Sequence, residues 1–232
     1  MNRTFVFDAV GTLLRPIPDV ITAYQQAGLR HGSSLDRQEV AARFKIARRR
    51  YFNCDTSAEA TGSGSLVSSD DIERELWRSL IGDVFHDVAA ADELFQQLWA
   101  HFALPESWGL YDDVAECLNC IAVNDQIVIA SNFDSRLLAI VAAFSELNCV
   151  SEVHCSAAVG FRKPDPMFYQ HVAGTIRDNH TVIMVEDDLQ NDCLAPERFG
   201  WQGIWLDRDG TAPNLDSAQR LTSLSQILAM SR

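Results

Sequence analysis

The sequence predicts an α/β protein in which a Rossmann-like parallel sheet, flanked by helices, carries an inserted α-helical cap. Short runs of β-branched and aromatic residues recur along the chain, and each is followed by a polar turn and a helical pattern. This alternation is typical of a parallel sheet covered by helices. A long interval between the first two runs has helical periodicity without a strand pattern, which indicates the insertion. The 232 residues are enough for both units.

Four segments have the composition of buried parallel strands: residues 4–7, 127–130, 182–185 and 203–206. We assign residues 1–15 and 108–232, which contain all four, to the core. In open α/β sheets, ligands bind beyond the carboxyl ends of the strands, where loops and helix N-termini converge. The residues that follow these segments are therefore the candidates for a functional site.

The interval 16–107 is assigned to the helical cap, because apolar residues such as Val40 and Phe44 recur there at helical spacing. A stretch rich in Gly and Ser, residues 58–69, is expected to be a loop between cap helices. The densest basic stretch of the chain lies at residues 43–50. It is expected to be a solvated helix face, with an arginine that holds a substrate carboxylate or phosphate as the alternative.

Composition and charge restrict the partners of the chain. The formal net charge of −13 argues against a nucleic-acid partner, because phosphate backbones are bound by a surplus of Lys and Arg. No apolar run approaches the length that crosses a bilayer, so no membrane partner is expected. The first residues lack a signal-like apolar stretch, which predicts a cytoplasmic protein. We expect a small anionic substrate, and a monomer or a homodimer.

The first candidate motif is an apolar strand that ends in Asp8 and a turn containing Gly11. An aspartate in this place can attack an electrophilic phosphorus or carbon atom and form a covalent intermediate. The alternative is a turn or helix-capping aspartate, which is the more common role of an isolated Asp after a strand.

Two further motifs supply polar groups, one at another strand end and one on a loop. The second predicted strand ends at Ser131 and Asn132, whose side chains can hydrogen-bond an anion or cap the next helix. Lys163 lies in a loop braced by Pro164. An ammonium group in this position can balance the charge of a nucleophilic carboxylate and of the transferred group, whereas an isolated lysine is usually a solvated surface residue.

The fourth motif is acidic. Glu186, Asp187 and Asp188 follow a hydrophobic strand, and Asp192 comes four residues later. Adjacent carboxylates repel one another unless a cation lies among them, and Mg²⁺ binds one or two carboxylates together with waters and substrate oxygens. A solvated acidic turn is the alternative for this segment taken alone.

In this order, the four motifs resemble those of the haloacid dehalogenase-like hydrolases over nearly the whole chain, including a helical cap after the first motif. The chain looks closest to a capped subgroup whose first motif is Asp-Ala-Val-Gly-Thr-Leu. The resemblance implies that Asp8 is the nucleophile and Lys163 the lysine of the catalytic set. It also implies substrate contacts and a Mg²⁺ site. The substrate contacts would come from Thr12, Ser131 and Asn132. The metal ligands would be Asp8, the carbonyl of Val10 and Asp187, with Glu186 or Asp188 adding an inner or outer contact and Asp192 supporting the set.

One position departs from the family pattern. Phosphatases of this family carry a second aspartate two residues after the nucleophile, and this chain has Val10 there. Acid/base help worth about 10²- to 10⁴-fold is therefore missing from the loop or comes from elsewhere. We favour a Mg²⁺-dependent phosphohydrolase of a small phosphorylated metabolite. The alternatives are a metal-independent 2-haloacid dehalogenase-type hydrolase, which needs no acid for a halide, and a catalytically impaired phosphoryl-binding protein.

Overall fold

The computed structural model describes residues 2–52, 66–188, 196–210 and 219–230. These residues form two compact units. Among the described residues, one unit comprises 2–15, 66–69, 110–188, 196–210 and 219–230, and the other comprises 16–52 and 70–109. We call them the core unit and the cap unit.

The core unit is built on a six-stranded sheet with the order β5-β4-β1-β6-β7-β8, in which all neighbouring strands are parallel. The strands are β1 (Arg3–Phe7), β4 (Gln126–Ser131), β5 (Glu152–Cys155), β6 (Thr181–Glu186), β7 (Gln202–Leu206) and β8 (Gln219–Leu221). The α/β class is therefore confirmed, and each of the four predicted segments lies inside a strand. Strands β5 and β8 were not predicted, because they are short and contain polar residues.

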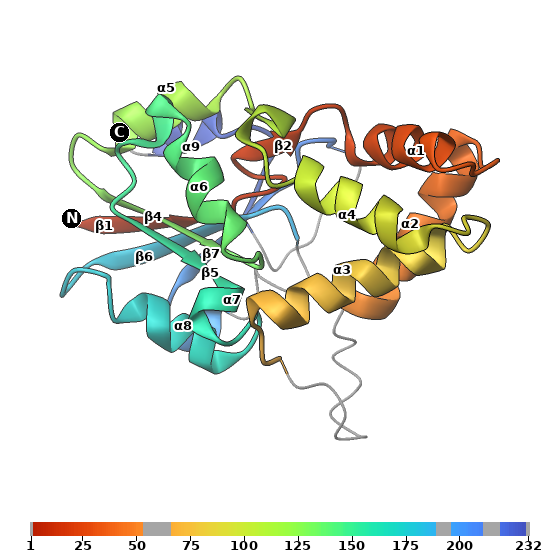
Figure 1. The fold of residues 1–232 in the computed structure, drawn as a ribbon. Helices are drawn as coiled ribbons and strands as arrows, with labels where there is room; N and C mark the ends of the chain where they lie inside the picture. Colours follow the sequence, from red (N-terminus) through yellow and green to blue (C-terminus); the bar gives the residue numbers. More distant parts are fainter. Residues whose placement is uncertain (1, 53–65, 189–195, 211–218, 231–232) are drawn as a thin grey trace. The chain divides into compact units, whose positions relative to one another are not determined.

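Helices cover both faces of this sheet, as Figure 1 shows, with α5, α6 and α9 above it and α8 below. On the lower face, Val6, Val128 and Met184 pack against Phe168 and Tyr169 of α8. Burial of both faces explains why the central strands are continuous apolar runs rather than alternating ones. The core helices are α5 (Val114–Ile121), α6 (Arg136–Ala142), α7 (Ser156–Val159), α8 (Pro166–Ala173) and α9 (Ser225–Met230), with 3-10 turns η3 (Ser145–Leu147) and η5 (Pro196–Phe199).

The described part of the cap unit contains four α-helices, which contact one another in the pairs α1·α2, α2·α3, α3·α4 and α1·α4. They are α1 (Val20–Arg30), α2 (Arg37–Phe52), α3 (Asp70–Val84) and α4 (Ala91–His101), followed by the turn η2 (Pro105–Ser107). Their shared core includes Tyr24, Leu80 and Phe95, all fully buried. The helical cap inferred from periodicity is therefore present.

Three short segments lie at the points where the chain passes between the units. Strands β2 (Leu14–Pro16) and β3 (Trp108–Leu110) form a two-stranded sheet. Residues 66–69 join the core unit, where Val67 forms an antiparallel bridge with Phe161. The rest of the predicted Gly/Ser-rich loop, residues 58–65, lies outside the described residues. No described helix is both long and apolar enough to span a membrane.

Candidate active site

The Asp8 loop is a compact turn at the carboxyl end of β1. The backbone N–H of Asp8 donates to the Val185 carbonyl of β6 at 3.0 Å, so Asp8 is placed directly after the last paired residue of β1. The N–H groups of Leu13 and Leu14 both donate to the Ala9 carbonyl at 2.8 Å. Gly11 has φ +90°, a backbone conformation that favours glycine. These hydrogen bonds and the backbone of Gly11 define the conformation of the turn that carries Asp8.

Lys163 bridges two carboxylates inside the core unit. Its Nζ lies 2.9 Å from Asp8 Oδ1 and 2.6 Å from Glu186 Oε1. The side chains of Lys163 and Glu186 are each 1% exposed, and that of Asp8 is 12% exposed. Two carboxylates around one ammonium leave a net negative charge in a nearly dry site, which is unfavourable unless a further positive group is bound. Asp8 and Lys163, the two residues predicted as catalytic, are thus in direct contact.

The backbone of Lys163 is held by Asn132. The Asn132 side chain accepts from the Lys163 N–H through Oδ1 at 2.7 Å and donates from Nδ2 to the Lys163 carbonyl at 3.0 Å. Just beyond, Asp165 caps the N-terminus of α8 by accepting from the Met167 N–H at 2.8 Å. Sequence reasoning assigned Asn132 to substrate binding. Its position as a clamp on the lysine loop was not foreseen, because the two residues are 31 positions apart.

Asp187 lies against the Asp8 loop. A Cβ atom placed on Gly11 would be 2.1 Å from Asp187 Oδ2, so the carboxylate packs directly on the glycine backbone. The Asp187 carbonyl accepts from Trp205 Nε1 at 3.1 Å, which anchors the residue to β7. Val10 belongs to the same turn and forms an isolated bridge with Leu14. Asp192, the remaining acidic residue of the predicted metal set, lies outside the described residues.

Two buried oxygens of the predicted site have no hydrogen-bond partner among the described residues. They are Thr12 Oγ1 and Glu186 Oε2. Both residues are at most 1% exposed, and Ser131 at the end of β4 is 2% exposed. Buried polar atoms are almost always satisfied in folded proteins, so these oxygens are places where a bound group would supply the missing contact.

The arrangement of the acidic residues shows whether they could hold the predicted cation. In the part of the chain that the structure describes, no three His, Cys, Asp or Glu side chains are grouped so as to hold a metal ion. Mg²⁺ needs only one or two protein carboxylates when waters and substrate oxygens complete its coordination. The unpaired oxygen of Glu186 and the close approach of Asp187 to Gly11 fit such a sparse site.

Arg208 is a further residue of the site, and sequence reasoning missed it. Its Nε donates to the Gly11 carbonyl at 3.2 Å, and a terminal nitrogen donates to the Thr12 carbonyl at 2.7 Å. The guanidinium also forms two hydrogen bonds with the carboxylate of Asp113, at 3.0 and 3.1 Å, and lies 3.9 Å from the ring centroid of Tyr111. The Asp8 loop is thus fixed from outside by an arginine nearly 200 residues further along the chain.

The electrostatics of Asp113 follow from this contact. Partial burial raises the pKa of its carboxyl, but hydrogen bonds from Arg208, Ser223 and the Leu224 N–H and the charge of Arg208 outweigh that effect. The net result is a pKa below the ordinary value of 3.8. Asp113 is therefore charged at neutral pH and holds Arg208 in position.

The fold and the site together define a Rossmann-like protein with a buried carboxylate, lysine and carboxylate triad at the carboxyl end of its parallel sheet. The family model of the haloacid dehalogenase-like hydrolases matches residues 2–200, and the chain belongs to this family. A relative from Danio rerio, haloacid dehalogenase-like hydrolase domain-containing protein 3, is 28% identical over 223 residues. The match covers 92% of this chain and 89% of the relative.

Solved structures with the same fold fall into more than one functional group. The putative HAD-hydrolase YfnB from Bacillus subtilis, bound to magnesium, has a TM-score of 0.72 at 18% identity, covering 99% of this chain and 98% of its own. The defluorinating L-2-haloacid dehalogenase Rha0230 also has a TM-score of 0.72, at 19% identity, with coverage of 99% and 94%. A HAD phosphatase from Thermococcus onnurineus has 0.64, at 16% identity, with coverage of 100% and 98%. At these identities the likeness shows the fold alone.

Proposed function

We propose that this hydrolase is a Mg²⁺-dependent phosphohydrolase of a small phosphorylated metabolite, with Asp8 as the nucleophile. The observation that supports this most is the charge of the site. Asp8 and Glu186 share the single ammonium of Lys163, and the carboxylate of Asp187 packs on the Asp8 loop. Three carboxylates and one lysine favour a bound cation and an anionic substrate that is held through it.

In this proposal, an oxygen of Asp8 attacks phosphorus, the bond to the leaving oxygen breaks, and an aspartyl phosphate forms. Water then attacks the phosphorus, which releases inorganic phosphate and restores the carboxylate. Lys163 balances the charge that the phosphoryl oxygens bring beside Asp8. The unpartnered hydroxyl of Thr12, together with Ser131, is suited to donate to those oxygens.

The cation would be held by Asp8, the carbonyl of Val10 and Asp187, with Glu186 and Asp192 supporting these ligands. When bound, Mg²⁺ offsets the negative charge of the carboxylates and phosphoryl oxygens, which lowers the barrier to their approach. The magnesium in the structure of the Bacillus subtilis protein supports the same choice of ion. A titration of the full chain with Mg²⁺, followed by calorimetry, measures this binding without turnover. We expect saturable binding that is weakened in Asp187→Asn.

Val10 determines which substrates react well. With no carboxyl at this position, no side chain of the Asp8 turn gives a proton to the leaving oxygen. Acyl and aryl phosphates need no such proton because their leaving groups are stable anions, so we propose that they are cleaved much faster than alkyl phosphates. We further propose that the chain acts on a small anionic molecule in the cytoplasm, without a nucleic-acid or membrane partner.

The test is phosphate release from p-nitrophenyl phosphate. We expect release to require Mg²⁺ and to be lost in Asp8→Asn. Asp112→Asn is a matched control, because the side chain of Asp112 is 96% exposed in the same unit. Release that continues unchanged in chelator, or in Asp8→Asn, would rule the proposal out.

A dehalogenase is the second candidate, because Val10 removes a group that halide departure does not need. In that reaction Asp8 displaces halide from carbon and forms an ester, and water attacks the carboxyl carbon of the ester. Turnover in ¹⁸O-labelled water therefore places the label in Asp8 for a dehalogenase and in phosphate for the phosphohydrolase. Halide release from small halo-carboxylic acids with label in Asp8 would select this candidate instead.

A further inference from the structure

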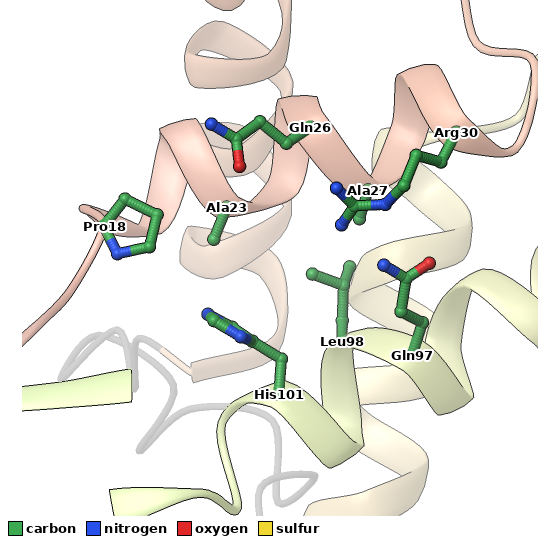
Figure 2. A pocket seen from close by; sticks show the side chains of 8 residues that line it. All are labelled: Pro18, Ala23, Gln26, Ala27, Arg30, Gln97, Leu98 and His101. Atoms are coloured by element: carbon green, nitrogen blue, oxygen red, sulfur yellow. The ribbon is translucent and has the colours of Figure 1, made fainter. Parts of the chain in front are cut away.

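The cap unit contains a cavity of about 60 Å³ between α1 and α4. Figure 2 shows the side chains that line it, with α1 contributing from above and α4 from below. They are Pro18, Ala23, Gln26, Ala27, Arg30, Gln97, Leu98 and His101. The volume is enough for a few water molecules or one small polyatomic ion. All of these residues belong to the cap unit, so the cavity is a feature of this unit alone.

Among the described residues, the lining carries positive charge and no negative charge. Arg30 contributes a guanidinium, and no Asp or Glu is among the described residues that line the cavity. When the Gln97 amide is turned so that its oxygen faces Arg30, that oxygen accepts from Nε at 2.9 Å and from a terminal nitrogen at 2.5 Å. A neutral amide positions the guanidinium without neutralising it, and no described carboxylate forms an ion pair with Arg30.

His101 offers a second nitrogen to the cavity. Its Nδ1 lies 3.1 Å from the hydroxyl of Ser107, and its Nε2 is buried without a hydrogen-bond partner among the described residues. Burial lowers the pKa of His101, and the positive charge of Arg30 lowers it further. If the Ser107 hydroxyl donates to Nδ1, the proton of the neutral ring is on Nε2, where it is a free donor.

Two arginines of the basic stretch are engaged in contacts within the cap. In the basic stretch 43–50, Arg43 donates to the Val84 carbonyl, and Arg50 forms an ion pair with Asp83 at 3.0 Å. Both are thus committed to contacts within the cap. Arg30, outside that stretch, combines an uncompensated charge with a cavity.

We infer that this cavity, which we call the cap site, binds a small oxyanion about the size of sulfate, inorganic phosphate or a short carboxylate. Arg30 and Nε2 of His101 donate to its oxygens, the amide of Gln26 adds a further donor, and Ala23, Ala27 and Leu98 form an apolar wall. Arginine is well matched to such ions, because its planar donors meet two oxygens at once. The inference does not rest on the proposed phosphohydrolase function, because none of its residues belongs to the Asp8 site.

Selenate is a suitable crystallographic probe, because the anomalous signal of selenium locates it directly. We expect crystals of the full chain soaked in selenate to show a selenium peak between Arg30 and His101, and Arg30→Leu crystals to lack it. Arg48→Leu is the matched control, since it removes a charge of the same sign from an exposed position of the cap, and the peak should remain. A cap site without selenium in the wild type, or a peak that persists in Arg30→Leu, overturns the inference.

A titration in solution covers the case in which a variant does not crystallise. The Asp8→Asn chain is titrated with sulfate and, in a second arm, with trifluoroacetate, while nuclear magnetic resonance follows the ring nitrogens of His101. We expect a saturable change in the chemical shift of Nε2, and an affinity for the ion that is roughly tenfold weaker in Arg30→Leu. The arm with the tighter affinity identifies the inorganic ion or the carboxylate as the preferred class. If the signal of His101 moves with neither ion, the cap site is not an oxyanion site.

Discussion

At the scale of single residues, the contact of Lys163 with Asp8 and Glu186 makes both function and stability depend on one ammonium group. Removal of that group leaves two buried carboxylates without a counter-charge. A buried charge that loses its partner costs far more than the original pair contributed. The same residue is therefore expected to determine turnover and part of the folding free energy.

Lys163→Met is expected to abolish turnover and to lower the free energy of unfolding by roughly 3 to 5 kcal/mol at neutral pH. Urea denaturation measures the second effect. The double variant Lys163→Met with Glu186→Gln should recover part of the loss, because one of the two stranded charges is gone. Equal stability of the single and double variants would show that charge is not the cause.

Gly11→Ala tests the close approach of Asp187. The new Cβ would overlap the Asp187 carboxylate, and the substitution would also require alanine to adopt φ +90°. Gly200→Ala separates the two effects, since Gly200 has φ +74° and open space around it. We expect both variants to lose about 1 to 2 kcal/mol of stability. Calorimetry should show a loss of Mg²⁺ affinity in Gly11→Ala alone. Equal affinities in the two variants would mean that Asp187 is not a ligand of the cation.

At the scale of the elements, a loop after β7 supports the turn after β1. Arg208 connects them through the carbonyls of Gly11 and Thr12, and Asp113 at the start of α5 holds Arg208. This contact stabilises the shape of the turn rather than touching the reacting atoms. Its loss should therefore affect the rate of reaction more than the binding of substrate.

Arg208→Leu is expected to lower kcat at least roughly tenfold with little change in KM, because the turn holds the nucleophile in a reactive geometry. Arg208→Lys should restore little of the rate, since one ammonium cannot reach two carbonyls and a carboxylate together. Steady-state kinetics on p-nitrophenyl phosphate measure both. Full rescue by lysine would mean that only the positive charge matters.

The lowered pKa of Asp113 predicts how the stabilising ion pair between Asp113 and Arg208 depends on pH. A carboxyl whose pKa is lower in the folded state than in the unfolded state stabilises the protein above the unfolded pKa, about 3.9. This stabilisation is lost as the pH falls through the folded value. Asp113→Asn should therefore be less stable than the wild type at pH 7, with a difference that shrinks below about pH 4. A difference that does not change with pH would exclude the ion pair as its source.

At the scale of the whole molecule, the sequence was informative wherever a pattern is local. The apolar runs predicted four of the six core strands, and helical periodicity predicted the cap. Contacts over long separations left no such pattern. Thr12 and Arg208 are 196 positions apart and no sequence pattern connects them, because the fold alone brings the loop after β7 to the turn after β1.

The candidate site shows the same division. Asp8, Lys163 and Glu186 could be selected because acidic and basic residues at strand ends and in the loops between strands form recognisable motifs. The clamp of Asn132 on Lys163 could not, since the same amide could equally bind a substrate. No sequence pattern marks Arg30, because only the packing of α1 on α4 makes it a cavity residue. The basic stretch at 43–50, by contrast, is a local pattern.

The central claim, a covalent intermediate on Asp8, is tested most directly by acid-quenched turnover of p-nitrophenyl phosphate followed by mass spectrometry of the Asp8 peptide. Val10 offers no carboxyl to activate water, whereas this leaving group needs no acid, so the second step should be slower than the first. We therefore predict a burst of nitrophenolate close to one per active site and a phosphoryl group on Asp8. Linear release with an unmodified Asp8 peptide would contradict the account.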